Sequence, residues 1–148
     1  YSPSPGTRCP DRLTVNGETD LAVLLRDLRP RLLAGTYVFC SIRDAQYGAF
    51  AHLEPLASVV EPEGLTLVVA QGAADREGLD YAGTFRCISL QVHSSLTAVG
   101  LTAQVASVLA ASGISANMLA GYYHDHVLVP SGQAEQALVL LESLAEAP

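Results

Sequence analysis

Two histidines flank an aspartate in the segment YYHDHVLVP, as His124, Asp125 and His126. On an extended strand, side chains two residues apart project to the same face, so both imidazoles could in principle reach one metal ion. Zinc requires at least three protein ligands, and the other histidines, His52 and His93, lie in distant segments. We therefore expect no metal site here. The segment is typical of a hairpin whose turn, near His124 and Asp125, is held by aspartate hydrogen bonds to the backbone.

The same three residues could also perform acid–base chemistry, but a catalytic histidine needs an oriented partner and a positioned nucleophile. The chain contains no G-x-S-x-G, no P-loop and no G-x-G-x-x-G. We expect no catalytic residues and no cofactor. A small metal-dependent enzyme that uses His124, Asp125 and His126 stays open as the less favoured alternative.

The serines of HSSLTAVG, residues 93–100, stand between an expected strand and an expected helix. Their hydroxyls could cap that helix, which is the common role of serine at such a junction. A helix N-terminus also offers free N–H groups and a partial positive charge, which suit a ligand carboxylate. In that interpretation Ser94, Ser95 and Thr97 leave room for an amino acid, Asn117 supplies a donor and an acceptor, and Asp125 binds the α-ammonium group.

The elements around this junction follow from hydrophobic periodicity. Residues 85–92 alternate as a strand, and residues 98–112 place Leu101, Val105, Val108 and Leu109 on one stripe before Gly113. Residues 114–123 and 126–130 are expected as two further strands. Ser131 is expected to cap a final helix, and the residues of that helix expected to face inward are Ala134, Ala137, Leu138, Leu141 and Leu144. The predicted order is β-α-β-β-α.

The preceding half has a related order. Thr19 is the expected N-cap of a helix that buries Leu21, Leu24, Leu25 and Leu28 and stops at Pro30. A strand at 36–42, a hairpin of 56–60 with 65–70, and a short helix at 73–78 follow. No linker separates the halves, and a β-α-β-β-α unit needs one more strand to complete a sheet. We expect the other half, or a second subunit, to supply this strand in an α+β fold with antiparallel sheets and helices on one face.

Composition excludes several classes of partner. The net charge of the 148 residues is −7, and all eight basic residues are arginines, none of them after Arg86. We therefore expect binding neither to nucleic acid nor to an anionic membrane surface. No apolar run reaches the roughly 20 residues of a membrane span. Three widely spaced cysteines indicate reduced thiols and a cytoplasmic protein, and residues 1–15, which lack a secretory signal, are expected to form a disordered or extended lead.

The run VHSSLTAVGLTAQVASVLAASGISANMLAGYYHDHVLVP resembles an ACT domain. The chain from about Asn16 is similar to small bacterial proteins built from tandem ACT-like halves, and NGETDL, GTYVFCSI and EPEGLTLVV extend the likeness into the first half. The resemblance implies ferredoxin-like βαββα units in tandem. It places the first half at residues 16–83 and the second, sharing a core with the first, at residues 84–148.

The resemblance also implies a non-catalytic sensor of small molecules, most often amino acids, that are bound where ACT units meet. Its partners would be an amino acid or small carboxylate, a second copy in a homodimer, and a regulated enzyme or transporter. An interaction or oligomerisation module without a ligand is the alternative. The implied ligand positions are Ser94, Ser95, Leu96, Thr97, Val99, Gly100 and Leu101, and then Ile114, Ser115 and Asn117. Known ACT domains are commonly fused to a catalytic or DNA-binding domain, for which 148 residues leave no room, so the output of the sensor stays open.

Overall fold

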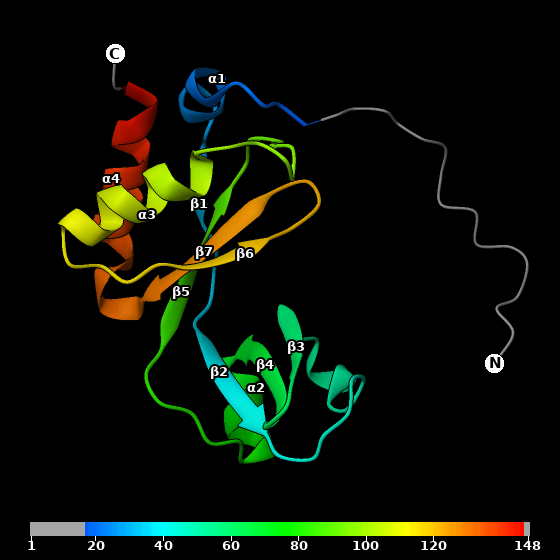
Figure 1. Cartoon of the computed structure of the whole chain (residues 1–148). Coiled ribbons are helices and arrows are strands. Elements are labelled where there is room, and N and C mark those ends of the chain that lie inside the picture. Colours follow the sequence, from blue (N-terminus) through cyan, green and yellow to red (C-terminus); the bar gives the residue numbers. More distant parts are fainter. Residues whose placement is uncertain (1–16, 147–148) are drawn as a thin grey trace, which may run out of the picture.

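A computed structural model describes residues 17–146 (Figure 1). The expected lead at residues 1–15, with Cys9, therefore lies outside the described residues. The elements, in chain order, are α1 (Leu21–Arg26), β1 (Pro30–Leu32), β2 (Tyr37–Ile42), the 3-10 turn η1 (Ala51–Leu53), β3 (Ala57–Glu61), β4 (Gly64–Ala70), α2 (Gln71–Glu77), β5 (Phe85–Leu90), α3 (Leu101–Ala111), β6 (Asn117–Ala120), β7 (Asp125–Pro130), the 3-10 turn η2 (Ser131–Gln133) and α4 (Ala134–Glu146).

The strands form one antiparallel sheet of order β3-β4-β2-β5-β7-β6, and β1 pairs separately with β5. Strand β5 joins the two halves of this sheet. Its first residue, Phe85, pairs with Tyr37 of β2, its far end pairs with β1, and its full length pairs with β7. The halves therefore meet along a single strand, as Figure 1 shows.

Each half repeats one arrangement: a first strand, a connection, a hairpin and a helix. Strands β2, β3 and β4 with α2 make the first copy, and β5, β6 and β7 with α4 make the second. The additional strand expected for the second copy is β1, which comes from the N-terminal half and pairs with β5 from Pro30↔Leu90 to Leu32↔Ile88. The antiparallel α+β architecture is as predicted.

The helices cover one face of the sheet. Alternation along β5 sends Ile88 and Leu90 toward α1, α3 and α4, where they form the main core with Leu24, Val105 and Leu141, all of them 0% exposed. A second, smaller core under α2 contains Val38, Cys40, Leu65, Leu67, Val69 and Ala74. On the opposite face of the sheet, Cys87 joins Val68 and Leu128 in a third cluster. Contacts across both faces hold the halves together.

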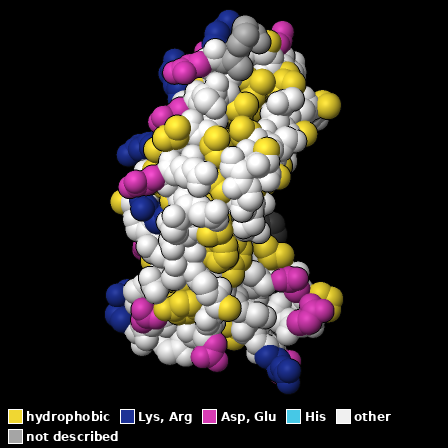
Figure 2. Space-filling model, turned by 90° about the vertical axis from the view of Figure 1, so that its left-hand side faces the viewer, with side chains coloured by type: hydrophobic (Ala, Val, Ile, Leu, Met, Phe, Trp, Pro, Cys, Tyr) yellow, Lys and Arg dark blue, Asp and Glu magenta, His cyan; other side chains and the backbone are white. Residues whose placement is uncertain are grey.

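The surface shows no single large apolar area in the view of Figure 2. On that face hydrophobic side chains form separated patches, and acidic side chains lie among the arginines rather than leaving a continuous basic stripe. Within the described residues, no helix has both the length and the apolar character needed to cross a membrane.

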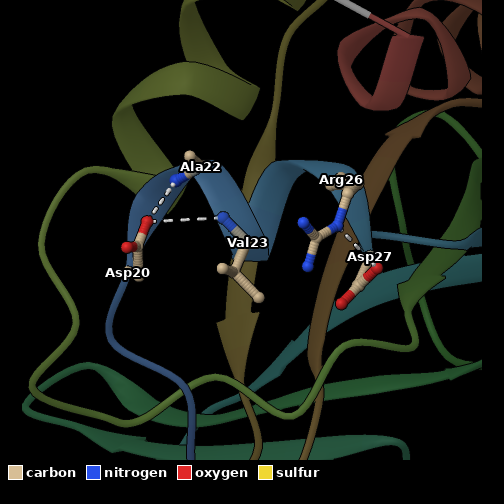
Figure 3. A network of polar contacts seen from close by, with 5 residues as sticks. All are labelled: Asp20, Ala22, Val23, Arg26 and Asp27. Carbon is tan, nitrogen blue, oxygen red and sulfur yellow. Dashed lines mark hydrogen bonds and ion pairs between the residues drawn. The ribbon is translucent and has the colours of Figure 1, made fainter.

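Helix α1 begins one residue later than the sequence suggests. Asp20, not Thr19, is the N-cap: its Oδ1 accepts hydrogen bonds from the N–H groups of Ala22 and Val23 at 2.9 and 3.4 Å (Figure 3). The Glu18 carboxylate accepts from the N–H groups of Thr19 and Asp20, both at 2.8 Å, and so satisfies the turn before the helix. An aspartate accepts at such a position as well as threonine does, so composition alone could not choose between neighbours.

The turn of the second hairpin also lies elsewhere than predicted. The Gly121 N–H donates to the carbonyl of His124 at 3.0 Å, so the turn comprises residues 121–124 and Asp125 already belongs to β7. A Cβ at position 121 would lie 2.6 Å from that carbonyl oxygen, which explains why glycine occurs here. The turn is therefore not held by Asp125.

Two helix starts differ for similar local reasons. Ser131 does not cap α4, because its Oγ lies 2.6 Å from Thr84 Oγ1 and the turn η2 intervenes before Ala134. Helix α3 starts at Leu101 instead of Ala98, after Gly100 at φ +104°, and it is followed by Gly113 at φ +71° as predicted. The stripe expected to face inward in α4 is confirmed, with Ala134, Ala137 and Leu141 buried.

Candidate functional site

The loop after β5 is the centre of the candidate site. Ser94 is 7% exposed, and its Oγ donates to Asp125 Oδ2 over 3.1 Å. Asp125 reaches this loop because it pairs with Leu90 at the end of β5. Sheet register therefore brings together two predicted site residues that are 31 positions apart in the sequence.

A short segment before α1 closes over the same loop. The Glu18 N–H donates to the His93 carbonyl at 2.9 Å, and the Ser95 N–H donates to the Glu18 carbonyl at 3.0 Å. A Cβ on Gly17 would lie 2.4 Å from the Ser95 nitrogen, so this close approach requires glycine. Sequence reasoning missed Gly17 and Glu18, although the glycine in NGETDL was the available signal.

The hydroxyl groups of the loop bind one another and do not cap the helix. Ser95 Oγ lies 2.9 Å from Thr97 Oγ1 and accepts from the Thr97 N–H at 3.2 Å. The N-cap of α3 is Gly100, which has no side chain to offer. Among the described residues, no side chain bonds the first N–H groups of α3, at Leu101 to Ala103, so the capping interpretation is wrong and the helix N-terminus remains free.

The rim of the site is apolar and exposed. Leu96 is 64% and Val99 84% exposed, whereas Leu101 points into the main core. Across the sheet edge, the Tyr123 ring lies 5.1 Å from the His93 ring, and Tyr122 beside it is 68% exposed. Exposed apolar side chains thus surround the loop and the adjacent hairpin turn.

The second group of predicted residues lies at the other end of α3. The Ile114 N–H donates to the Leu109 carbonyl at the C-terminus of the helix, and exposed Ser115 follows. Asn117 pairs with Leu128, three positions along β7 from Asp125, and donates weakly to the Leu128 carbonyl over 3.4 Å. An eleven-residue helix is about 16 Å long, so one chain does not bring this group next to Ser94.

The two histidines of the hairpin are part of the fold. His126 on β7 pairs with Ser89 and Leu119, and burial lowers its pKa together with the neighbouring His124, while Asp125 acts in the opposite direction. The Nδ1 atoms of His124 and His126 are buried and have no hydrogen-bond partner among residues 17–146. In that range no three His, Cys, Asp or Glu side chains gather as metal ligands would, so nothing supports the metal-enzyme alternative.

Comparison with known proteins identifies the family. Two family models, both described as ACT domain, match residues 16–86 and 84–143. No curated protein matches the chain.

Solved structures share the fold. A Vibrio cholerae protein of unknown function, described as a possible transport protein, is 48% identical with a TM-score of 0.77, covering 84% of this chain and 95% of its own. An Agrobacterium tumefaciens protein is 20% identical with a TM-score of 0.66, covering 78% of this chain and 87% of its own. The regulatory subunit of aspartate kinase from Thermus thermophilus is 13% identical with a TM-score of 0.54, covering 78% and 95% respectively.

Proposed function

Because this chain belongs to the ACT domain family, we propose that it is a regulatory protein that binds a small molecule and catalyses no reaction of its own. ACT domains are regulatory, non-catalytic modules. The likeness to a regulatory subunit of aspartate kinase is consistent with this role, although at 13% identity it concerns the fold alone.

The proposed ligand is an amino acid or a related small carboxylate. One observation carries this proposal: the N-terminus of α3 follows a loop rich in hydroxyl groups, yet no described side chain caps it. Free N–H groups and the positive end of the helix dipole suit a carboxylate. Beside them, Asp125 uses Oδ2 to accept from Ser94, which leaves its second oxygen for an ammonium group.

The proposed pocket lies between ACT units of two chains. Its first side consists of Ser94, Ser95, Leu96, Thr97, Val99, Gly100, Leu101 and Asp125. Since Ile114, Ser115 and Asn117 lie about one helix length away, they would take part only from a second copy. The exposed Leu96, Val99 and Tyr122 favour such contact, because apolar side chains at a surface often mark interfaces. We therefore keep a homodimer, and a regulated protein partner, in the proposal.

The remaining parts of the proposal concern organisation and location. Residues 16–83 and 84–148 form the two ACT units that share a core. The two free cysteines described, Cys40 and Cys87, are buried, which fits a cytoplasmic protein with reduced thiols. Neither nucleic acid nor a membrane is a proposed partner, because the net charge is −7.

A thermal-shift screen against the common amino acids tests the proposal. Ligand at a hundred times its dissociation constant should stabilise the protein by about 2.7 kcal/mol, which is a shift of several degrees for a domain of this size. Ser95→Leu should abolish the shift. Ser107→Leu, at an exposed position along α3, is the matched control and should preserve it.

Two other results would redirect the proposal. Dimerisation without any response to amino acids or small carboxylates would favour the pure interaction module. A shift with zinc, lost on chelation and abolished by His126→Ala, would instead revive the metal-dependent alternative.

A further inference from the structure

The two copies of the repeat differ at one connection. Between β5 and β6 the eleven-residue helix α3 covers the sheet and places Leu101, Val105 and Leu109 in the main core. Between β2 and β3 the corresponding connection contains only the three-residue turn η1. The N-terminal half therefore has no full helix at the place where the C-terminal half buries one.

A pocket of about 390 Å³ lies beside this shortened connection. Its walls include Tyr47 and Ala51 from the connection and Pro55 and Leu56 before β3, and Ser58 of β3 and Leu67 of β4 complete it. Leu67 also belongs to the core under α2, so the pocket reaches down to the sheet. Its volume is at the lower end of the range for small-molecule sites.

The lining is chemically simple. No charged side chain lines the pocket, and most of its side chains are aliphatic. Ser58 is the exception: its Oγ is buried and has no hydrogen-bond partner among residues 17–146. Nearly all buried polar groups in proteins are paired, so this hydroxyl lacks a partner that a bound molecule would provide.

The connection is held in a defined conformation. Asp44, Phe50 and Glu54 adopt left-handed backbone angles, with φ of 61°, 61° and 50°. Such conformations cost energy in residues other than glycine and persist only where the surroundings impose them. His52 Nε2 lies 2.6 Å from Glu77 Oε1 of α2, and Phe50 packs against the core beneath that helix. The pocket is thus preformed by anchored chain.

We propose that this pocket binds a small neutral molecule with an apolar body and one hydroxyl or carbonyl group that pairs with Ser58. A free amino acid does not fit, because its charged groups would lose water without meeting a charged partner. The site is separate from the loop after β5 and does not depend on the function proposed for that loop.

Three probes of similar shape and different charge test this proposal: benzyl alcohol, benzoate and benzylamine, titrated at pH 7 into ¹⁵N-labelled full chain and followed by NMR. Benzyl alcohol should cause saturable shifts at the amides of residues 47–58 and Leu67, and the two charged probes should not. Ala51→Phe, which fills the pocket from an exposed position, should abolish these shifts, while Ala110→Phe, at an exposed position on α3, should preserve them. No saturable shift with benzyl alcohol, or equal binding of all three probes, overturns the proposal.

Ser58→Ala separates the role of the hydroxyl from that of the apolar walls. Removing an unpaired buried hydroxyl should raise the Tm of the free protein, so loss of binding cannot be ascribed to unfolding. The variant should bind benzyl alcohol about tenfold more weakly, as expected for one lost hydrogen bond, and toluene as well as before. Unchanged affinity for benzyl alcohol would overturn the pairing with Ser58.

Discussion

At the scale of single residues, the bond between Ser94 and Asp125 decides how the loop after β5 is held. Ser94 is buried, whereas Asp125 is only half-buried and can be hydrated when it loses this donor. Asp125→Ala should therefore cost about 1–3 kcal/mol, because it leaves a buried hydroxyl unpaired, and Ser94→Ala should cost less. Urea unfolding at pH 7 measures both. The double variant should be about as stable as Asp125→Ala alone, and strictly additive losses would show that the pair does not act as one unit.

His126 should make stability depend on pH. Its pKa in the folded protein is below the ordinary value of 6.5, mainly through burial, so the unfolded chain binds more protons between those two values. The contribution of His126 is therefore complete above pH 6.5 and is lost as the pH falls through the lowered pKa. Unfolding free energies from pH 7.5 to 5.5 should decline less for His126→Gln than for the natural chain. Identical pH profiles would contradict this assignment.

The buried thiols should be inert. Burial raises the pKa of Cys87 to about 11, and burial together with Asp80 raises that of Cys40. At pH 8 a thiol with that pKa is thiolate in about one molecule in a thousand, and only the thiolate reacts rapidly. Alkylation followed by peptide mass mapping should leave both cysteines unmodified in folded protein and modify both in urea. Rapid labelling of Cys87 under native conditions would disprove its burial.

The sequence predicted the residues of the candidate site better than their arrangement. The pairing of Ser94 with Asp125 could be anticipated because it needs only the β5–β7 register. The separation of Asn117 from that pair was not anticipated, since it depends on the direction of β6 and the length of α3. The free N-terminus of α3 depends on Ser95 bonding to Thr97 instead of the helix, a competition between neighbours that composition does not resolve.

At the scale of elements, the segment before α1 is the least obvious support of the site. Gly17 lies against the backbone of Ser94 and Ser95, where a neighbouring atom cannot move cheaply. Gly17→Ala should separate this segment from the loop and speed hydrogen exchange at the Ser95 amide, which donates to Glu18. Gly132→Ala, where an added Cβ meets nothing within 4 Å, is the control. Unchanged exchange at Ser95 in Gly17→Ala would show that the contact is dispensable.

Most elements could be predicted because their hydrophobic period is regular, as in α4 and in the hairpin of β3 with β4. Their ends were less certain, because a cap depends on one hydrogen bond at Asp20, Gly121 or Gly100. Strand β1 was not predicted as a strand. Its three residues are too few for alternation to be visible, and only the free edge of β5 makes them extended.

At the scale of the whole molecule, the N-terminal segment completes the C-terminal half. Leu24 and Leu28 are 0% exposed and lie in the main core with residues of β5, β7, α3 and α4, while the core under α2 is separate. This arrangement ties any ligand-driven movement of the loop after β5 to α1 and β1. It also explains how two ACT units can be one folded body although β5 meets β2 at a single register pair.

The two cores should therefore respond differently to damage. Leu28→Ala should cost about 2–5 kcal/mol and should speed hydrogen exchange in α3, α4 and β7 more than in β3 and β4. Leu67→Ala, a matched truncation in the core under α2, should show the reverse pattern. Mass spectrometry of exchanged peptides from the full chain separates these regions. If both variants speed exchange equally everywhere, the two ACT units unfold as one cooperative unit and the contacts through β5 and the Cys87 cluster are stronger than the single register pair suggests.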